Sequence, residues 1–322
     1  MSWHSIGSQL TLLRGRAATV DYVLLALFAH SGFGLWVVLV KYLLHYLPPF
    51  RLSAVAFSIA VPVTFLIARR HITWDDFRRP DLWLLSGITL ARSVTKLLAL
   101  QYTLATYVQL LDLIIPFIAP ILAWLWLREH MPRGTLVALA ATSLGSFLVI
   151  ARDPLAVQLP NGVSDVMGIG LALVSATAMA AGIVTIRYLT ARRVNPVATF
   201  FQPAIATALT YWALSGLTGE SWQPFLRLEL TNWAFYAALI AFSLIGAGLI
   251  QALAISRTNT ALYSTLLSWR LAVALAAGWL LLGESLTSLW QAAGVIMVVV
   301  ALTVYLWRAG GRPRAPEESI IE

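Results

Sequence analysis

Four ionisable side chains stand inside long apolar stretches of the sequence: Arg92, Lys96, Asp112 and Arg270. A charged group near the centre of a bilayer costs ~2.5–3.5 kcal/mol on insertion, so each should face a partner or a hydrated cavity. Only one of the four is a carboxylate, which leaves an excess of positive charge. A guanidinium presents a planar fork that binds an oxyanion at two points. The sequence therefore predicts a central cavity that attracts a carboxylate, phosphate or similar anionic group, with Arg92 and Arg270 as substrate contacts. For Arg92 the alternative is a hydrogen bond to carbonyls of a kinked helix.

Lys96 and Asp112 flank a predicted turn near Ala105. At 1.5 Å per residue they lie about 13 and 10 Å below this turn, so they can pair across the helical hairpin. Two roles follow from this position: a structural ion pair, or a contact with substrate or with a proton. Pro116 and Pro120 remove backbone donors just past Asp112 and should bend the helix there. A bend near a buried charge suits a binding site, and a static kink without function is the alternative.

Ten nearly uncharged stretches must position these groups. Hydrophobic residues make up 59% of the chain and charged residues 11%, a balance that excludes a water-soluble globular domain. Each stretch has roughly 17 to 23 residues, enough to cross a hydrocarbon layer of about 30 Å as a helix. Helices are favoured because an unpaired backbone group in lipid costs several kcal/mol. The predicted spans are 22–41, 51–68, 82–104, 106–127, 134–151, 166–186, 196–217, 233–256, 260–282 and 288–307.

Two segments of the chain, 98–131 and 253–286, read alike. Aligned without a gap, they share a Thr, a Trp and a Glu at common positions, the last being Glu129 and Glu284. The repeat unit is five helices, and because five is odd its two copies enter the membrane from opposite sides. Such inverted halves can expose a central site alternately to each side. We therefore predict an all-α integral membrane fold of ten transmembrane helices in two inverted five-helix repeats. A static symmetric bundle is the alternative.

Three further candidates come from the second half of the chain. Gln251 aligns with Lys96 across the repeat and should project toward the same central region. Trp269 and Tyr263 lie near Arg270 and could stack on an aromatic or apolar part of a substrate, with plain packing as the alternative.

The first span supplies His30 and Lys41, eleven residues apart and on one helix face. His30 could carry a proton, or bond to a neighbouring helix. Lys41 is close to the helix end, where a lysine can extend to the interface.

The ends of the two aligned segments, WLWLREHM at 124–131 and WLLLGESL at 279–286, resemble the EamA branch of the drug/metabolite transporter superfamily. The resemblance covers nearly the whole chain, although Arg128 replaces the usual glycine before the first glutamate. It implies that helices 3, 4, 8 and 9, with parts of 1 and 6, surround a central cavity. It also implies that helices 5 and 10 are peripheral and that helices 2 and 7 help to gate the cavity. Pro62 and Pro203, central in spans two and seven, are therefore gating candidates.

The net charge of +8 is a topology signal. Most Lys and Arg residues fall in segments that are inside when the N-terminus is cytoplasmic, so the positive-inside rule favours both termini in the cytoplasm. A nucleic-acid partner is not expected. We predict a multi-pass protein of the cell membrane, specifically the bacterial inner membrane. The predicted divisions are a cytoplasmic segment 1–20, repeats 21–153 and 154–307, and a disordered cytoplasmic tail 308–322.

The resemblance favours a secondary active or facilitative transporter that exports a small organic metabolite, either amino-acid-like or another anionic or zwitterionic solute. The basic core leaves an exchanger or importer of an anionic phosphorylated or nucleotide-like metabolite as the alternative, and a non-transporting membrane scaffold is a third. The sequence has no H-E-x-x-H, no G-x-S-x-G and no P-loop motif, so no enzyme activity and no cofactor or metal are predicted. Expected partners are a small-molecule substrate and membrane lipids. A coupled proton and a homodimer are open alternatives.

Overall fold

The computed structural model describes residues 24–69, 78–128, 134–151, 162–192, 194, 196–251, 267–284 and 286–310. Within these ranges the chain is helical and contains no strand. The predicted segment 1–20 and the tail beyond Gly310 lie outside the described residues. The first helix is Leu24–Leu43. The later elements are α2 (Pro49–Ala68), α4 (Pro80–Tyr102), α5 (Ala105–Leu111), η1 (Asp112–Ile114), α6 (Ile115–Leu127), α7 (Thr135–Ala151), α8 (Val163–Ala191), α9 (Pro196–Leu217), α10 (Gln223–Leu226), α11 (Leu230–Ala238), η2 (Leu239–Gly246), α14 (Leu267–Leu282) and α15 (Leu289–Gly310).

Length and apolarity make these helices membrane-spanning. Among the described residues, six helical segments are long and apolar enough to cross a bilayer: Leu24–Leu43, Pro49–Leu66, Pro80–Tyr102, Ala105–Trp126, Val163–Thr190 and Leu230–Gln251. Shorter apolar helices are Leu136–Ala151, Trp269–Leu282 and Leu289–Tyr305. Large apolar side chains, including Leu84, Val137 and Leu280, are exposed along them. Lipid, unlike water, accepts such a surface, so these helices indicate a multi-pass membrane protein.

Prolines mark several helix starts. Pro49 opens α2 and Pro80 opens α4, where a proline costs no helical hydrogen bond because the first N–H groups have no partner within the helix. Asp81 follows in the first turn of α4, where a negative charge suits the helix dipole. Both helices begin within two residues of the predicted spans.

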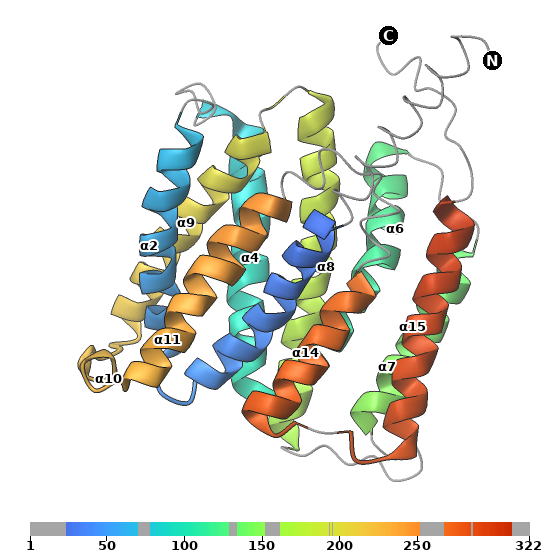
Figure 1. The fold of residues 1–322 in the computed structure, drawn as a ribbon. Coiled ribbons are helices and arrows are strands. Elements are labelled where there is room, and N and C mark those ends of the chain that lie inside the picture. Colours follow the sequence, from blue (N-terminus) through green and yellow to red (C-terminus); the bar gives the residue numbers. More distant parts are fainter. Residues whose placement is uncertain are drawn as a thin grey trace, which may run out of the picture.

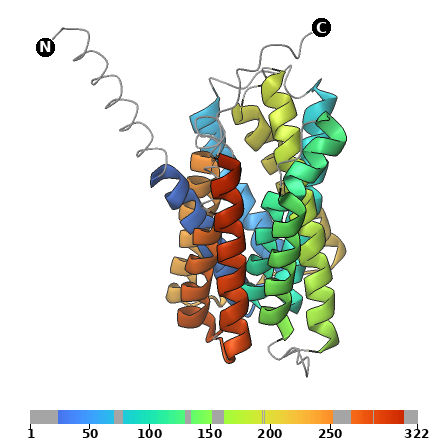
Figure 2. The same ribbon diagram turned by 90° about the vertical axis from the view of Figure 1, so that its right-hand side faces the viewer.

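The helices run up and down in one bundle (Figures 1 and 2). α4 packs on α8 and α9, α2 packs on α9, and α6 packs on α8. α7 and α15 pack along each other at one edge of the bundle, and α14 contacts α5. The first helix begins and α15 ends at the same end of the bundle.

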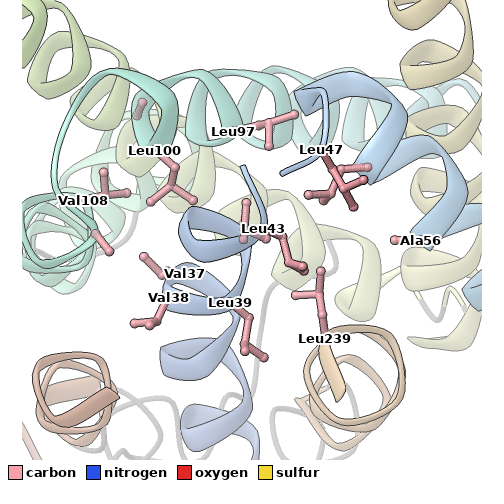
Figure 3. Close-up of a cluster of buried hydrophobic side chains, with 14 of the residues drawn as sticks. Val37, Val38, Leu39, Leu43, Leu47, Ala56, Leu97, Leu100, Val108 and Leu239 are labelled. Carbon is pink, nitrogen blue, oxygen red and sulfur yellow. The ribbon is translucent and has the colours of Figure 1, made fainter. Parts of the chain in front are cut away.

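The largest hydrophobic core surrounds the second half of the first helix. Val37 and Leu43 of this helix pack with Leu97 and Leu100 of α4 and with Leu239 of η2 (Figure 3). The first helix is therefore surrounded by elements from both halves of the chain. This packing fixes the helix face that carries His30.

Candidate functional site

Asp112 lies where the helical geometry of the fourth span changes. α5 ends at Leu111, one turn of 3-10 helix follows, and α6 continues from Ile115. Pro116 has no N–H to donate to the carbonyl of Asp112. The N–H of Ile115 donates to that carbonyl instead, which tightens the turn. The α-helix of the fourth span is thus interrupted at Asp112, next to the two prolines from which a bend is predicted.

The Asp112 carboxylate contacts two cations from two other helices. Lys96 Nζ of α4 donates to Asp112 Oδ2 at 2.5 Å, and Arg270 Nη1 of α14 lies 4.0 Å from the same oxygen. Arg270 Nη2 is 3.2 Å from Nδ1 of His30 on the first helix. Because arginine has donors only, Nδ1 is the acceptor. The four side chains are buried, with exposed fractions of 4% for Lys96, 3% for Asp112, 1% for Arg270 and 0% for His30.

Aromatic rings of the first helix cover the two cations. The guanidinium carbon of Arg270 lies 4.8 Å from the centre of the Phe33 ring, and Lys96 Nζ lies 5.5 Å from that of Trp36. Between them, Gly34 lets the first helix approach α14 closely, since a Cβ there would stand 2.8 Å from the carbonyl oxygen of Arg270. Sequence reasoning missed these three residues. Phe33 and Gly34 follow His30 by three and four residues, a spacing that could have placed them on its face, whereas Trp36 follows it by six.

Arg92 adds positive charge beside this cluster. It is half-buried on α4, one turn before Lys96, and lies within electrostatic range of Lys96 and of Tyr211 on α9. The Tyr211 hydroxyl is 2.7 Å from Oγ of Ser93, and the backbone carbonyl of Arg92 accepts a hydrogen bond from Ser175 of α8 at 3.0 Å. Arg92 therefore lies where α4 meets α8 and α9.

Positive charge is in excess at this site. In the described part of the chain, Asp112 is the carboxylate that Lys96 and Arg270 contact. Nε of Arg270 is buried and has no hydrogen-bond partner among the described residues. An unpaired buried donor is costly, so a ligand oxygen that accepts from it would gain binding energy. The geometry is thus suited to an anionic group that shares the cations with Asp112.

The secondary candidates have mixed positions. Lys41 donates from Nζ to the carbonyl of Leu100 at 2.7 Å instead of extending to the interface. Gln251 is half-buried and is the last described residue of its helix. Trp269 is 46% exposed and its indole N–H donates to Ser31 at 2.9 Å. Tyr263 lies outside the described residues.

Pro62 and Pro203 lie inside α2 and α9, two helices that pack on each other. Pro62 is exposed and Pro203 is buried. Their gating role stays a prediction.

The comparison with known families gives a match over residues 21–151, to the EamA-like transporter family. This part of the chain is EamA-like. The resemblance is thereby confirmed for residues 21–151, which include the first of the two aligned segments, 98–131. Members of the EamA-like family are transporters, which fits a multi-pass membrane protein with a small-molecule substrate.

The EamA-like match includes most of the cluster. His30, Lys96 and Asp112 lie inside it, whereas Arg270 lies beyond its end. No curated protein matches the sequence. A solved structure titled "Crystal structure of protein" has a similar fold, with a TM-score of 0.55 and 16% sequence identity, over 85% of this chain and 95% of that one.

Proposed function

We propose that the chain is a ten-helix carrier of two inverted five-helix repeats, and that it exports a small anionic or zwitterionic organic metabolite by alternating access. The binding site is the cluster of Arg270, Lys96, Asp112 and His30. Arg92, Gln251, Trp269 and Tyr263 are its further predicted contacts, and Pro62 and Pro203 its predicted gates. The observation that carries the proposal is the buried guanidinium of Arg270, which has one donor unpaired among the described residues and shares the carboxylate of Asp112 with Lys96.

The packing of the helices supports the inverted repeat. In the predicted repeat, α2 corresponds to α9 and α4 corresponds to the helix that contains η2. Exchanging the two halves therefore converts the contact of α4 with α9 into the contact of η2 with α2, and both contacts are present. The pairs α7 with α15, α2 with α9, and α5 with α14 convert into themselves. Pairs that are unchanged by the exchange are expected to lie on a pseudo-two-fold axis, around which one half can move against the other.

The cluster supports transport through competition. In the structure Asp112 partly neutralises Lys96 and Arg270. A substrate carboxylate can replace Asp112 at Arg270 and use the free Nε donor, while a substrate ammonium group could pair with the released Asp112. Such an exchange alters the contacts between α14 and η1, so the substrate interacts differently with the two conformations. A ligand shifts a conformational equilibrium only through such a difference.

The excess of positive charge favours a second candidate, exchange or import of a phosphorylated or nucleotide-like anion. A phosphate group brings more negative charge than a carboxylate and would use Arg92 in addition to Arg270. A membrane scaffold, in contrast, gains little from two buried cations and the half-buried Arg92 beside one carboxylate.

Thermal-shift screening of the purified protein against amino acids, carboxylates and phosphorylated metabolites tests the proposal. We expect a stabilising ligand of one of these classes, and Arg270→Ala should weaken its binding about tenfold or more, because a charge-assisted bidentate contact is lost. Arg270→Lys should retain part of the affinity. Uptake of the labelled ligand into proteoliposomes then measures transport.

Arg192→Ala is the matched control, since Arg192 is exposed and pairs with Asp81 at 3.5 Å near the end of α8. It should bind the ligand like the unmodified chain. Undiminished ligand binding and uptake in Arg270→Ala would remove Arg270 from the site, and a screen without any stabilising solute would favour the scaffold.

A further inference from the structure

Glu284, just after α14, binds the start of α5 with its carboxylate. Oε1 accepts a hydrogen bond from the N–H of Ala105 at 2.9 Å, and Oε2 accepts from the N–H and the hydroxyl of Thr106 at 2.9 and 2.7 Å. The residue that precedes α5, Leu104, provides no side-chain cap. Two of the N–H groups that a helix start leaves unpaired are therefore satisfied by a residue almost 180 positions away in the sequence.

The local backbone holds Glu284 in position. Gly283 has a φ of +67°, in the left-handed region that glycine adopts without strain. Beyond it the N–H of Glu284 donates to the carbonyl of Gly278 at 3.1 Å. The helix end thus turns the carboxylate toward α5, where the positive end of the helix dipole adds to the attraction.

Other polar contacts hold the same connection between α4 and α5. Lys41 of the first helix donates to the carbonyl of Leu100 at 2.7 Å. From the start of α8, Ser164 donates to the carbonyl of Tyr102 at 2.9 Å, and Asp165 accepts from the hydroxyl of Thr103 at 2.5 Å. The first helix, α8 and α14 therefore all bind this connection, which closes the bundle at the end where α5 begins.

This closed end lies directly above the binding cluster. Asp112 follows Thr106 by six residues, about 9 Å along the helix. Glu284 joins α14, which carries Arg270, to α5, which leads to Asp112. Separation of these two helices would therefore expose the cluster from this end.

We infer that Glu284 is a gate residue: its carboxylate leaves the start of α5 each time the transport pathway opens at this end, which is the outer end in the predicted topology. The inference rests on the proposed function, since it needs a central site to which the pathway leads. Water entering the opened end replaces the carboxylate as partner of the N–H groups of Ala105 and Thr106. The bond is reversible, so it sets the ratio of closed to open molecules without blocking the cycle.

Cysteine labelling tests the gate directly, because the chain has no cysteine of its own. The reporter is Trp36→Cys, which replaces the half-buried ring beside Lys96. In proteoliposomes, a membrane-impermeant thiol reagent is added outside, and Ser221→Cys in the exposed segment before α10 measures the fraction of molecules with that end facing out. Glu284→Gln should speed labelling of the reporter about five- to tenfold. Loss of a helix cap usually shifts a two-state equilibrium by about this factor, here from closed toward open molecules.

Two more variants keep the test decisive. Thr106→Val removes one of the three hydrogen bonds to Glu284 and should give a smaller increase in the labelling rate of the reporter. This variant still tests the gate if Glu284→Gln folds poorly. Gln291→Leu is the matched control: Gln291 accepts from the N–H of Thr287 at 2.7 Å and donates to Val149 at 3.0 Å, so it performs a similar task in the pair α7–α15. Its labelling rate should stay within twofold of the reporter alone.

Equal labelling rates in Glu284→Gln, Thr106→Val and the unmodified gate would overturn the role of Glu284. If an Arg270-dependent ligand is found at the same time, the proposed function stands and only the gate is lost. If no variant labels and no ligand binds, the interior is dry and both proposals fail together.

Discussion

α7 meets α15 through backbone, whereas α14 meets α5 and η1 through charged side chains. In the first pair a Cβ on Gly145 would stand 2.8 Å from the carbonyl oxygen of Gly294, and one on Gly294 would stand 2.5 Å from that of Gly145. Val298 fills the space beside the crossing. Small residues at such a crossing let two membrane helices pack at close range.

The second pair holds together by the bonds of Glu284 to α5 and by the ion pair of Arg270 with Asp112. Close-packed backbones have one good spacing and resist deformation. Hydrogen bonds and ion pairs can be exchanged for water or for a substrate at small net cost. The comparison teaches that α7 and α15 form a fixed support, and that movement is expected between α14 and α5.

Removing the central carboxylate should have the largest effect. In Asp112→Asn, Lys96 and Arg270 stay buried without their counter-ion, so we expect a loss of ~3–5 kcal/mol in the free energy of unfolding. Circular dichroism during unfolding in mixed micelles measures this loss. The double variant Lys96→Met with Asp112→Leu should recover part of it, because the shortest ion pair is then removed as a unit. A loss below ~1 kcal/mol in Asp112→Asn would mean that other groups neutralise the cluster.

A methyl group at the glycine crossing should come next. Gly294→Ala would force α7 and α15 apart and cost ~1–3 kcal/mol, as overpacking usually does. The same melting experiment measures it, and binding of the ligand from the screen should persist in the fraction that folds. Gly170→Ala on α8 is the control, since nothing lies within 4 Å of its added Cβ. It should be neutral or stabilise the helix by up to ~1 kcal/mol. An equal free energy of unfolding in the two variants would contradict a tightly packed crossing of α7 and α15.

Local features of the sequence predict some of this arrangement. Apolar runs fix where helices such as α2 and α4 occur, since only a continuous run can cross lipid. Proximity in one hairpin makes the contact of Lys96 with Asp112 predictable from helix geometry alone. Pro116 likewise predicts a break in the α-helix beside Asp112, where the structure has a 3-10 turn.

Contacts between distant segments were beyond such reasoning. His30 and Arg270 meet across 240 residues, and their contact depends on how the first helix is placed in the bundle. The two glutamates of the repeat signal its symmetry in the sequence, but the bonds of Glu284 to the start of α5 require the tertiary fold. The close approach that Gly34 allows could not be predicted either, because it depends on the position of α14 in the bundle.

The smallest effect is expected where the first helix meets the exposed side of α14. Trp269→Phe removes the hydrogen bond from the indole N–H to Ser31, and we expect a loss of ~0.5–1.5 kcal/mol in stability. Because phenylalanine keeps an aromatic ring that can stack on a substrate, ligand affinity should change less than twofold. Thermal shift with and without the ligand measures both quantities. A large loss of affinity with unchanged stability would instead show that the substrate needs the indole of Trp269 itself, and the moving surface of α14 would then extend beyond the face that carries Arg270.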